Sequence, residues 1–291
     1  METAVVRAIR RGGLDRKLFS QCAGERTRCT IAVVFKIKRK SLLTSMNNSA
    51  PELSIIIPSY NEEARLPGSL ERIANYIQSQ QPNTEVIVVD DGSTDGTAAV
   101  VELFRGKIPS LRVLSNGVNR GKGFSVRHGS LQAYGEVILF TDADLSAPIE
   151  EVGKLLEALE NHDVAIGSRA IDRRLIETRQ SAFRELAGIL FNKIVRIILS
   201  LPFVDTQCGF KAFRRERCRI IFEQQTVERF GFDPEILYLA RHHGLSTVEV
   251  PVRWANSPAT TVSMLKDSLR MFADVFIIRI NGLMGRYRRG I

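Results

Sequence analysis

The chain has 291 residues, of which 44% are hydrophobic and 25% charged, a composition typical of a globular protein with a sizeable core rather than of a disordered one. Four cysteines without a Cys-x-x-Cys pair argue against a disulfide scaffold and against a zinc site. The net charge of +9 would suit a nucleic-acid binder, but residues 1–45 hold eleven Lys or Arg residues against three acidic ones. The rest of the chain is nearly neutral, so we expect no nucleic-acid partner.

Residues 1–50 are predicted to form a basic, disordered extension. They show no clear helical or strand period, and no apolar stretch is long enough for a signal peptide. Met46 offers a second plausible start, so an artefact of the start site and a basic tail attracted to anionic lipid both stay open. We therefore expect the folded domain to span residues 51–291. No window reaches the ~18 uninterrupted apolar residues of a membrane span.

From residue 53 onward, short β-branched runs alternate with helical patterns. Strands are expected at 53–57, 85–89, 111–114, 137–140 and 164–166. Helices are expected between them, at 62–80, 94–105, 122–134 and 149–161. Beyond residue 170 the pattern predicts helices at 183–199, 234–242 and 264–280 and a strand at 247–254. Apolar strands with helical crossovers indicate an α/β fold, whose mostly parallel sheet is covered by helices on both faces.

Polar clusters follow three of the predicted strands. They are Pro-Ser-Tyr-Asn-Glu-Glu at 58–63, Asp-Asp-Gly-Ser-Thr-Asp-Gly at 90–96 and Thr-Asp-Ala-Asp at 141–144. Ligands of an open α/β sheet bind beyond the carboxyl ends of its strands. Capping the following helices would need one oxygen, whereas several carboxylates on one rim repel each other unless cations neutralise them. We therefore predict a binding site at this edge of the sheet.

The residue types at this edge suit a nucleotide and a metal ion. Asp142 and Asp144 form an Asp-x-Asp pair, which suits Mg²⁺ or Mn²⁺ bridging phosphate oxygens. The aromatic Tyr60 and the acceptors Glu62 and Asp91 suit a base and a ribose. Lys122, in Asn-Arg-Gly-Lys-Gly at 119–123, suits phosphate binding or loop anchoring, and a plain turn with a solvated lysine explains it equally well. Neither Gly-x-Gly-x-x-Gly nor a phosphate-binding loop motif is present.

These motifs, with Gly-Ser-Arg at 167–169, resemble family 2 glycosyltransferases of the GT-A fold, a Rossmann-like, mostly parallel sheet flanked by helices. Two later segments narrow the resemblance: Asp-Thr-Gln-Cys-Gly-Phe-Lys at 205–211 and Val-Glu-Arg-Phe-Gly-Phe-Asp at 227–233. Both resemble dolichyl-phosphate β-glucosyltransferases and their prokaryotic polyprenyl-phosphate relatives. The resemblance covers about residues 53–285.

The resemblance implies a role for each matching residue. Nucleoside contacts would come from Pro58, Tyr60, Glu62, Val89 and Asp91. Ribose, the Mg²⁺ or Mn²⁺ ion and the diphosphate would be held by Asp142, Ala143 and Asp144. Arg169 and Arg184 match arginines that lie near the acceptor phosphate in the related dolichyl-phosphate mannose synthases, and a guanidinium binds a phosphate bidentately. The implied reaction is inverting transfer of a hexose, most simply glucose from UDP-glucose, to dolichyl or undecaprenyl phosphate.

Alternative functions stay open at this point. A phosphate acceptor has a second pKa near ~6, is ionised at neutral pH and needs no general base. A glycosyltransferase acting on a saccharide hydroxyl would need one, and Asp233 lies where many family 2 enzymes place it. A GDP-mannose-dependent polyprenyl-phosphate mannosyltransferase is a further possibility. Intact Asp142 and Asp144 argue against a nucleotide-sugar-binding module without turnover.

The C-terminal helices suggest where the protein acts. Residues 183–199 and 264–280 interleave apolar with basic residues, as interfacial helices do, although core-facing helices share this pattern. With the basic end at 286–289, they favour peripheral association with the cytoplasmic face of a membrane. The chain departs from the resemblance in three features: the missing N-terminal membrane span, Ala259-Thr260-Thr261 in place of a Gly-Ser-Lys segment, and Gly188 in place of a serine.

Overall fold

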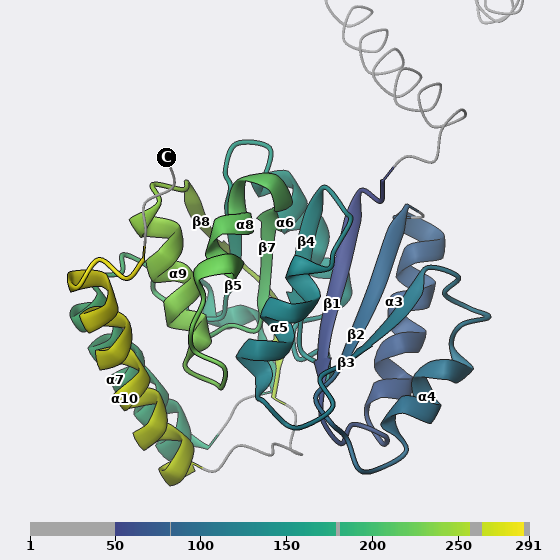
Figure 1. Ribbon diagram of the computed structural model, residues 1–291, viewed down its shortest axis with the longest axis horizontal. Helices are drawn as coiled ribbons and strands as arrows, with labels where there is room; N and C mark the ends of the chain where they lie inside the picture. The colour runs from purple at the N-terminus through teal and green to yellow at the C-terminus, as the bar shows by residue number, and fades with distance from the viewer. Residues whose placement is uncertain (1–49, 82, 179–180, 257–263, 288–291) are drawn as a thin grey trace, which may run out of the picture. The chain divides into compact units, whose positions relative to one another are not determined.

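The computed structural model describes residues 50–81, 83–178, 181–256 and 264–287, without the side chains of residues 182–184 and 264–268. The predicted extension up to residue 49, the segment 259–261 and the basic residues after 287 lie outside this range. Within these ranges, seven strands form one sheet in the order β3-β2-β1-β4-β7-β5-β8 (Figure 1). β6 pairs with β9 in a second sheet. The strands are β1 (Leu53–Ser59), β2 (Thr84–Asp90), β3 (Leu111–Ser115), β4 (Val137–Thr141), β5 (Val164–Ser168), β6 (Ile176–Thr178), β7 (Phe210–Arg214), β8 (Thr247–Pro251) and β9 (Trp254–Ala255).

Helices connect most of these strands. They are α3 (Leu66–Gln80), α4 (Thr97–Leu103), α5 (Lys122–Leu131), η2 (Ile149–Glu151), α6 (Val152–Ala158), η3 (Arg173–Leu175), α7 (Ala182–Leu199), α8 (Arg215–Gln224), α9 (Phe232–His242) and α10 (Met264–Leu283). The first helix begins four residues later than predicted. Asn61 has a φ of 53°, outside the helical region, and Pro67 suits the first helical turn because the N–H it lacks would have no partner there.

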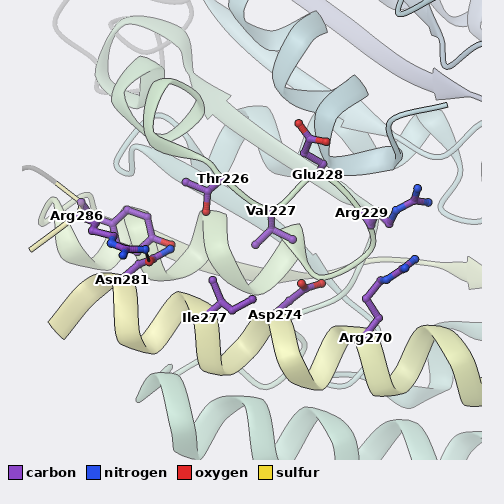
Figure 2. A pocket seen from close by; sticks show the side chains of 10 residues that line it. Thr226, Val227, Glu228, Arg229, Arg270, Asp274, Ile277, Asn281 and Arg286 are labelled. Atoms are coloured by element: carbon purple, nitrogen blue, oxygen red, sulfur yellow. Dashed lines mark hydrogen bonds between the residues drawn. The ribbon is translucent and has the colours of Figure 1, made fainter. Parts of the chain in front are cut away.

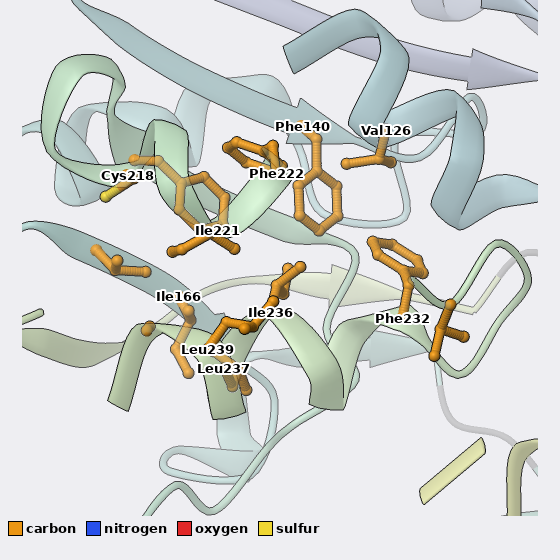
Figure 3. Packing of buried hydrophobic residues seen from close by; sticks show 14 of the residues in the cluster. Val126, Phe140, Ile166, Cys218, Ile221, Phe222, Phe232, Ile236, Leu237 and Leu239 are labelled. Atoms are coloured by element: carbon orange, nitrogen blue, oxygen red, sulfur yellow. The ribbon is translucent and has the colours of Figure 1, made fainter. Parts of the chain in front are cut away.

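Helices cover both faces of the sheet, which explains the near-continuous apolar strands. On one face, Ile56, Ile87 and Val89 pack with residues of α5, α8 and α9. Figure 3 shows other members of this cluster, which come from the same three helices and from β4 and β5. On the other face, Ile55 and Val88 pack with residues of α3, α4 and α6. Alternate side chains along a strand therefore enter different cores. The predicted α/β class with a mostly parallel sheet is confirmed.

Two features differ from the sequence prediction. β7 and α8 were not expected, and β7 lies antiparallel between β4 and β5. Its sequence, Phe-Lys-Ala-Phe-Arg, lacks the apolar run of the other central strands, yet Lys211 is fully buried. The strand predicted at 247–254 is divided into β8 and β9. β8 ends at Pro251, which has no N–H for a sheet hydrogen bond.

α7 and α10 pack against each other beside α9 (Figure 1). Phe191 and Phe272 meet edge to face with ring centroids 4.8 Å apart, and Val195 and Val275 are fully buried. Large apolar side chains on both helices are nevertheless exposed: Leu186, Ile189, Leu190, Ile197, Leu269, Phe276, Ile277, Ile280 and Leu283. Within the described ranges, no helix combines the length and hydropathy needed to cross a membrane.

Candidate active site

The predicted polar clusters meet at one edge of the sheet. β1 pairs in parallel with β2 on one side and with β4 on the other, with Ser59 opposite Asp90 and Ile56 opposite Phe140. Because all three strands point the same way, the residues that follow them emerge at the same rim. The structure thus brings residues 60–63, 91–96 and 142–144 together, as the strand pattern predicted.

Asp142 and Asp144 lie at the centre of this rim. The ammonium of Lys122, the first residue of α5, contacts Asp142 Oδ1 at 2.5 Å. Asp144 Oδ1 accepts a hydrogen bond of 3.0 Å from the Ser146 N–H, and Arg65 Nη1 lies 3.8 Å from Oδ2. Both carboxylates remain partly exposed, 34% for Asp142 and 19% for Asp144, so a ligand can reach them.

The Asp142 carboxylate also depends on a glycine that the sequence reasoning did not single out. A Cβ at Gly209 would lie only 2.3 Å from Asp142 Oδ2. A side chain at position 209 would therefore have to displace the carboxylate of Asp142. The sequence signal was present, since Gly209 belongs to the segment that narrowed the family resemblance, but its neighbour is 67 positions away in sequence.

The charges at the rim act on each other. Burial disfavours the charged form of Lys122, but the nearby carboxylates of Asp142, Asp233 and Asp144 raise its pKa, so the lysine stays protonated. Glu62 has a raised pKa, chiefly because of burial and further because of Asp144 and Asp142, while its ion pair with Arg65 opposes the shift. Among the described residues, Lys122 and Arg65 are therefore the cations that offset these carboxylates.

Asp91 holds the loop that carries Lys122. Its Oδ1 accepts hydrogen bonds from Asn116 Nδ2 at 2.7 Å and from the Arg120 N–H at 3.0 Å, and its Oδ2 accepts one from the Gly121 N–H at 2.7 Å. Gly121 has a φ of 111°, which other residues rarely adopt. Asp91 is 3% exposed, and its hydrogen bonds in the structure fix this loop. The predicted contact of Asp91 with a nucleoside stays a prediction.

The other residues assigned to the nucleoside lie on the same two strands or just beyond them. Pro58 and Val89 are opposite each other in the register of β1 and β2, and both are buried. Tyr60 is 39% exposed at the rim, where its ring is available for stacking. Ala143 is buried, and its carbonyl accepts a hydrogen bond of 2.6 Å from Ser69 Oγ. Contacts of these residues with a nucleotide remain predictions.

Arg169 is held by a partner that the sequence did not reveal. Its Nε donates to Asp205 Oδ2 at 2.7 Å and its Nη2 to Oδ1 at 2.8 Å, and its N–H also donates to Oδ2. Burial opposes both charges, but the attraction within the pair raises the pKa of Arg169 and lowers that of Asp205 to about 2. The guanidinium is thus fixed in place, and its Nη1 makes no hydrogen bond to any other described residue. Arg184 lies in the first turn of α7, and its side chain falls outside the described part.

The sequence is similar to those of known proteins. The family model of glycosyl transferase family 2 matches residues 54–221. The chain belongs to this family. A dolichyl-phosphate β-glucosyltransferase of Drosophila melanogaster is 39% identical over 252 residues, which cover 81% of this chain and 77% of the relative. The enzymes of that name from Homo sapiens and Saccharomyces cerevisiae are both 34% identical, covering 87% and 81% of this chain and 82% and 76% of their own lengths.

Solved structures agree with the fold of this family 2 glycosyltransferase. A glucosyl-3-phosphoglycerate synthase from Mycobacterium tuberculosis, in complex with Mn²⁺, UDP and glucosyl-3-phosphoglycerate, superposes with a TM-score of 0.57 at 19% identity. The match covers 78% of this chain and 80% of that one. A second complex of that synthase, with Mg²⁺ and UDP, gives a TM-score of 0.59 at 20% identity and covers 78% and 79%. The predicted GT-A fold is confirmed.

The donor set at the rim fits a hard divalent cation. The described residues contain no cluster of three or more His, Cys, Asp or Glu side chains that could hold a metal by itself. Mg²⁺ commonly binds one or two carboxylates and completes its shell with water and substrate phosphates, so a pair such as Asp142 and Asp144 would suffice, and their role as ligands stays a prediction. The contact between Lys122 and Asp142 shows that this position attracts positive charge.

A buried ion pair lies behind the rim. Lys211 is fully buried, donates to the Cys208 carbonyl at 2.5 Å and forms a salt bridge with Asp233 Oδ1. Asp233 is only 5% exposed, so the carboxylate considered as a general base is already paired with a lysine. Because Lys211 is 22 positions away and lies in a strand that was not predicted, the sequence pattern gave no sign of this pairing.

The described cysteines are buried, and the described histidines are hydrogen-bonded. Burial raises the pKa of both Cys208 and Cys218 to about 12, so the thiols are unreactive at neutral pH. His128 is hydrogen-bonded to Asn116, and no described histidine belongs to a cluster of potential metal ligands.

Proposed function

We propose that the chain transfers glucose from UDP-glucose to a polyprenyl phosphate such as dolichyl or undecaprenyl phosphate, with Mg²⁺ or Mn²⁺ at Asp142 and Asp144. The observation that carries this proposal is 39% identity to a dolichyl-phosphate β-glucosyltransferase over 81% of the chain. The rim supports it, because it gathers two partly exposed carboxylates and a lysine where a nucleotide diphosphate would bind.

The chemistry follows from the acceptor. A phosphate monoester is ionised at neutral pH, so one of its oxygens attacks the anomeric carbon directly while the bond from that carbon to UDP breaks. Attack from the opposite face inverts the centre, and an α-linked donor gives a β-linked product. Lys122 lies next to the expected diphosphate and offsets the negative charge of the leaving group. A bound divalent ion would supply further stabilisation of that charge.

Arg169 is the proposed contact for the acceptor phosphate, together with Arg184. Asp205 holds the Arg169 guanidinium through Nε and Nη2, which leaves Nη1 for a phosphate oxygen. A guanidinium fixed in advance loses little conformational entropy when it binds, so the pairing with Asp205 is compatible with acceptor binding. It also means that Arg169 contributes to folding, and its replacement will affect more than the acceptor.

A saccharide hydroxyl is the less favoured acceptor. Such a reaction needs a general base, and the carboxylate of Asp233 is buried and bound to Lys211. GDP-mannose is the alternative donor to be tested, because the geometry of the rim favours neither uracil nor guanine. The names of the curated relatives support glucose.

A membrane surface is the proposed location, at its cytoplasmic face. Polyprenyl phosphates reside in membranes, and α7 and α10 expose leucine, isoleucine and phenylalanine side chains on the faces they do not pack. Exposed apolar side chains beside basic residues are typical of helices that lie in the interface of a bilayer. Lys193, Arg196 and Arg279 supply positive charge on the same two helices.

The proposed function is tested by a matrix of donors and acceptors. Purified chain with Mn²⁺ should transfer label from UDP-glucose to dolichyl or undecaprenyl phosphate, and neither from GDP-mannose nor to free saccharides. Asp144→Asn should abolish transfer without unfolding, because it removes charge but keeps shape. Asp172→Asn, the same change near the exposed Arg174, is the matched control and should be active. Transfer from GDP-mannose alone, or to saccharides alone, would contradict the proposal.

The membrane location is tested by sedimentation with vesicles that contain anionic phospholipid. Wild-type chain should sediment with the vesicles, and a Leu186→Ser, Phe276→Ser double variant should bind several-fold less. Leu103→Ser removes an equally apolar side chain, 80% exposed on α4, and serves as the control. Equal binding by all three proteins would argue against α7 and α10 as the membrane face.

A further inference from the structure

Glu235, on α9, is a carboxylate for which the proposed reaction has no use. It is fully buried, and no described Lys or Arg lies within ion-pair distance of it. We propose that Glu235 and Tyr287 are positioning residues for Lys122, and that they link the end of α10 to the donor site. The inference rests on the proposed function only in taking Lys122 as part of that site.

Glu235 binds four hydrogen-bond donors from two parts of the chain. The Thr226 N–H donates to Oε1 and Oε2 at 3.0 and 3.1 Å, the Thr226 hydroxyl to Oε1 at 2.6 Å, and the Val227 N–H to Oε2 at 2.8 Å. The Tyr287 hydroxyl donates to Oε1 at 2.8 Å. Burial and the Glu235 carboxylate raise the pKa of Tyr287, which keeps the phenol protonated as a donor. The carboxylate therefore fixes both the loop before α9 and Tyr287, which lies four residues beyond the end of α10.

The loop fixed by Glu235 in turn holds the loop of Lys122. Gln225 Nε2 donates to the Gly123 carbonyl at 2.8 Å, and the Phe124 N–H donates to the Glu228 carbonyl at 2.9 Å. The two loops touch so closely that a Cβ at Gly121 or Gly123 would lie 2.6 Å from a carbonyl oxygen of this segment. A shift of residues 225–229 must therefore move the residues on both sides of Lys122.

Lys122 transmits that position to the site, because its ammonium contacts Asp142. On the far side, α10 faces the segment 226–229 across a pocket of about 490 Å³, in which Thr226 and Val227 lie opposite Asp274 and Ile277 (Figure 2). Tyr287 bridges this gap at one end. A displacement of α10 is thereby coupled to the position of Lys122 through hydrogen bonds that the structure describes.

Tyr287→Phe tests this coupling with minimal change of shape. Tyr238→Phe is the matched control, because Tyr238 packs on α10 at Gly282 and near the Tyr287 ring but makes no hydrogen bond to Glu235. In titrations of Mn²⁺ and UDP, we expect affinity to fall roughly tenfold for Tyr287→Phe, about 1.4 kcal/mol, and to stay unchanged for Tyr238→Phe. Equal effects of the two variants would overturn the inference. Glu235→Gln should resemble Tyr287→Phe, because an amide cannot accept all four bonds.

A double-mutant cycle separates positioning from general loosening. If Tyr287 acts through Lys122, Tyr287→Phe should have no further effect on UDP affinity in a Lys122→Met background. Independent, additive losses would overturn the role.

Amide hydrogen exchange needs no nucleotide. Tyr287→Phe and Glu235→Gln, but not Tyr238→Phe, should accelerate exchange at Phe124. Unchanged exchange at Phe124 would overturn the inference. If the variants show the expected faster exchange at Phe124 but the wild-type protein does not bind UDP, the inference stands and the proposed function is refuted.

Discussion

Replacing Asp205 by Asn removes the carboxylate that accepts two hydrogen bonds from the Arg169 guanidinium, of 2.7 Å from Nε and 2.8 Å from Nη2. Asp205 is only 5% exposed, and although burial disfavours its charge, Arg169 and neighbouring N–H groups lower its pKa to about 2. An unperturbed aspartate has a pKa near ~3.9, and one pKa unit corresponds to about 1.4 kcal/mol. The ionised carboxylate therefore contributes about 2–3 kcal/mol to folding at neutral pH.

In urea unfolding at pH 7, the free energy of unfolding of Asp205→Asn should be lower than that of the wild type by about that amount. Because the folded pKa is depressed, the contribution is complete above the pKa of the unfolded chain and is lost as the pH falls from about 4 towards 2. The difference from wild type should shrink in the same window.

Asp172→Asn is the control for this experiment. Asp172 contacts Arg174 with similar two-point geometry, 2.9 and 2.8 Å, but the guanidinium is 90% exposed and solvent screens the pair. Its unfolding midpoint should hardly change. Equal losses for the two variants, or no loss for Asp205→Asn, would refute the reasoning.

Three further changes test other parts of the structure. Gly209→Ala would place a Cβ 2.3 Å from Asp142 Oδ2, so transfer should fall by about 10- to 100-fold, whereas Gly153→Ala, in open space on α6, should be fully active. Burial and the neighbouring Glu235 carboxylate raise the pKa of Asp274, so its charge destabilises the folded protein at pH 7. Asp274→Asn should therefore raise Tm at pH 7, and this gain should vanish below about pH 4, where the carboxyl is protonated in wild type. A lower Tm of the variant at pH 7 would contradict this reasoning. Burial raises the pKa of Cys218 to about 12, so iodoacetamide at pH 8 should label it only after urea unfolding, as peptide mass spectrometry would register.

The sheet was predictable where burial dominates local sequence. Five apolar runs became β1 to β5, because strands covered on both faces need apolar residues at successive positions. β7 was not predicted, because Lys211 interrupts its apolar residues, as in a strand with one face exposed to solvent. The compensating carboxylate of Asp233 is 22 residues away, and a pattern read within a short window contains no information about such a partner.

The same limit applies to the site. The types of residue at the strand ends were sufficient to place the rim, because parallel strands that point the same way bring their carboxyl ends together. The partners of those residues were not predictable. Arg169 looked available for a phosphate, but Asp205, 36 positions later, holds it, and Asp91 turned out to fix the loop of Lys122. These contacts depend on the three-dimensional path of loops that lack any periodic signal.

The structure of the product tests the central claim most directly. Purified chain should be incubated with α-linked UDP-glucose, Mn²⁺ and a short-chain polyprenyl phosphate, and the lipid product analysed by mass spectrometry and NMR. The account predicts a single hexose joined to the lipid phosphate in the β configuration, as direct displacement by an ionised phosphate requires. A product with the α configuration, or one in which glucose is joined to a saccharide hydroxyl, would contradict it.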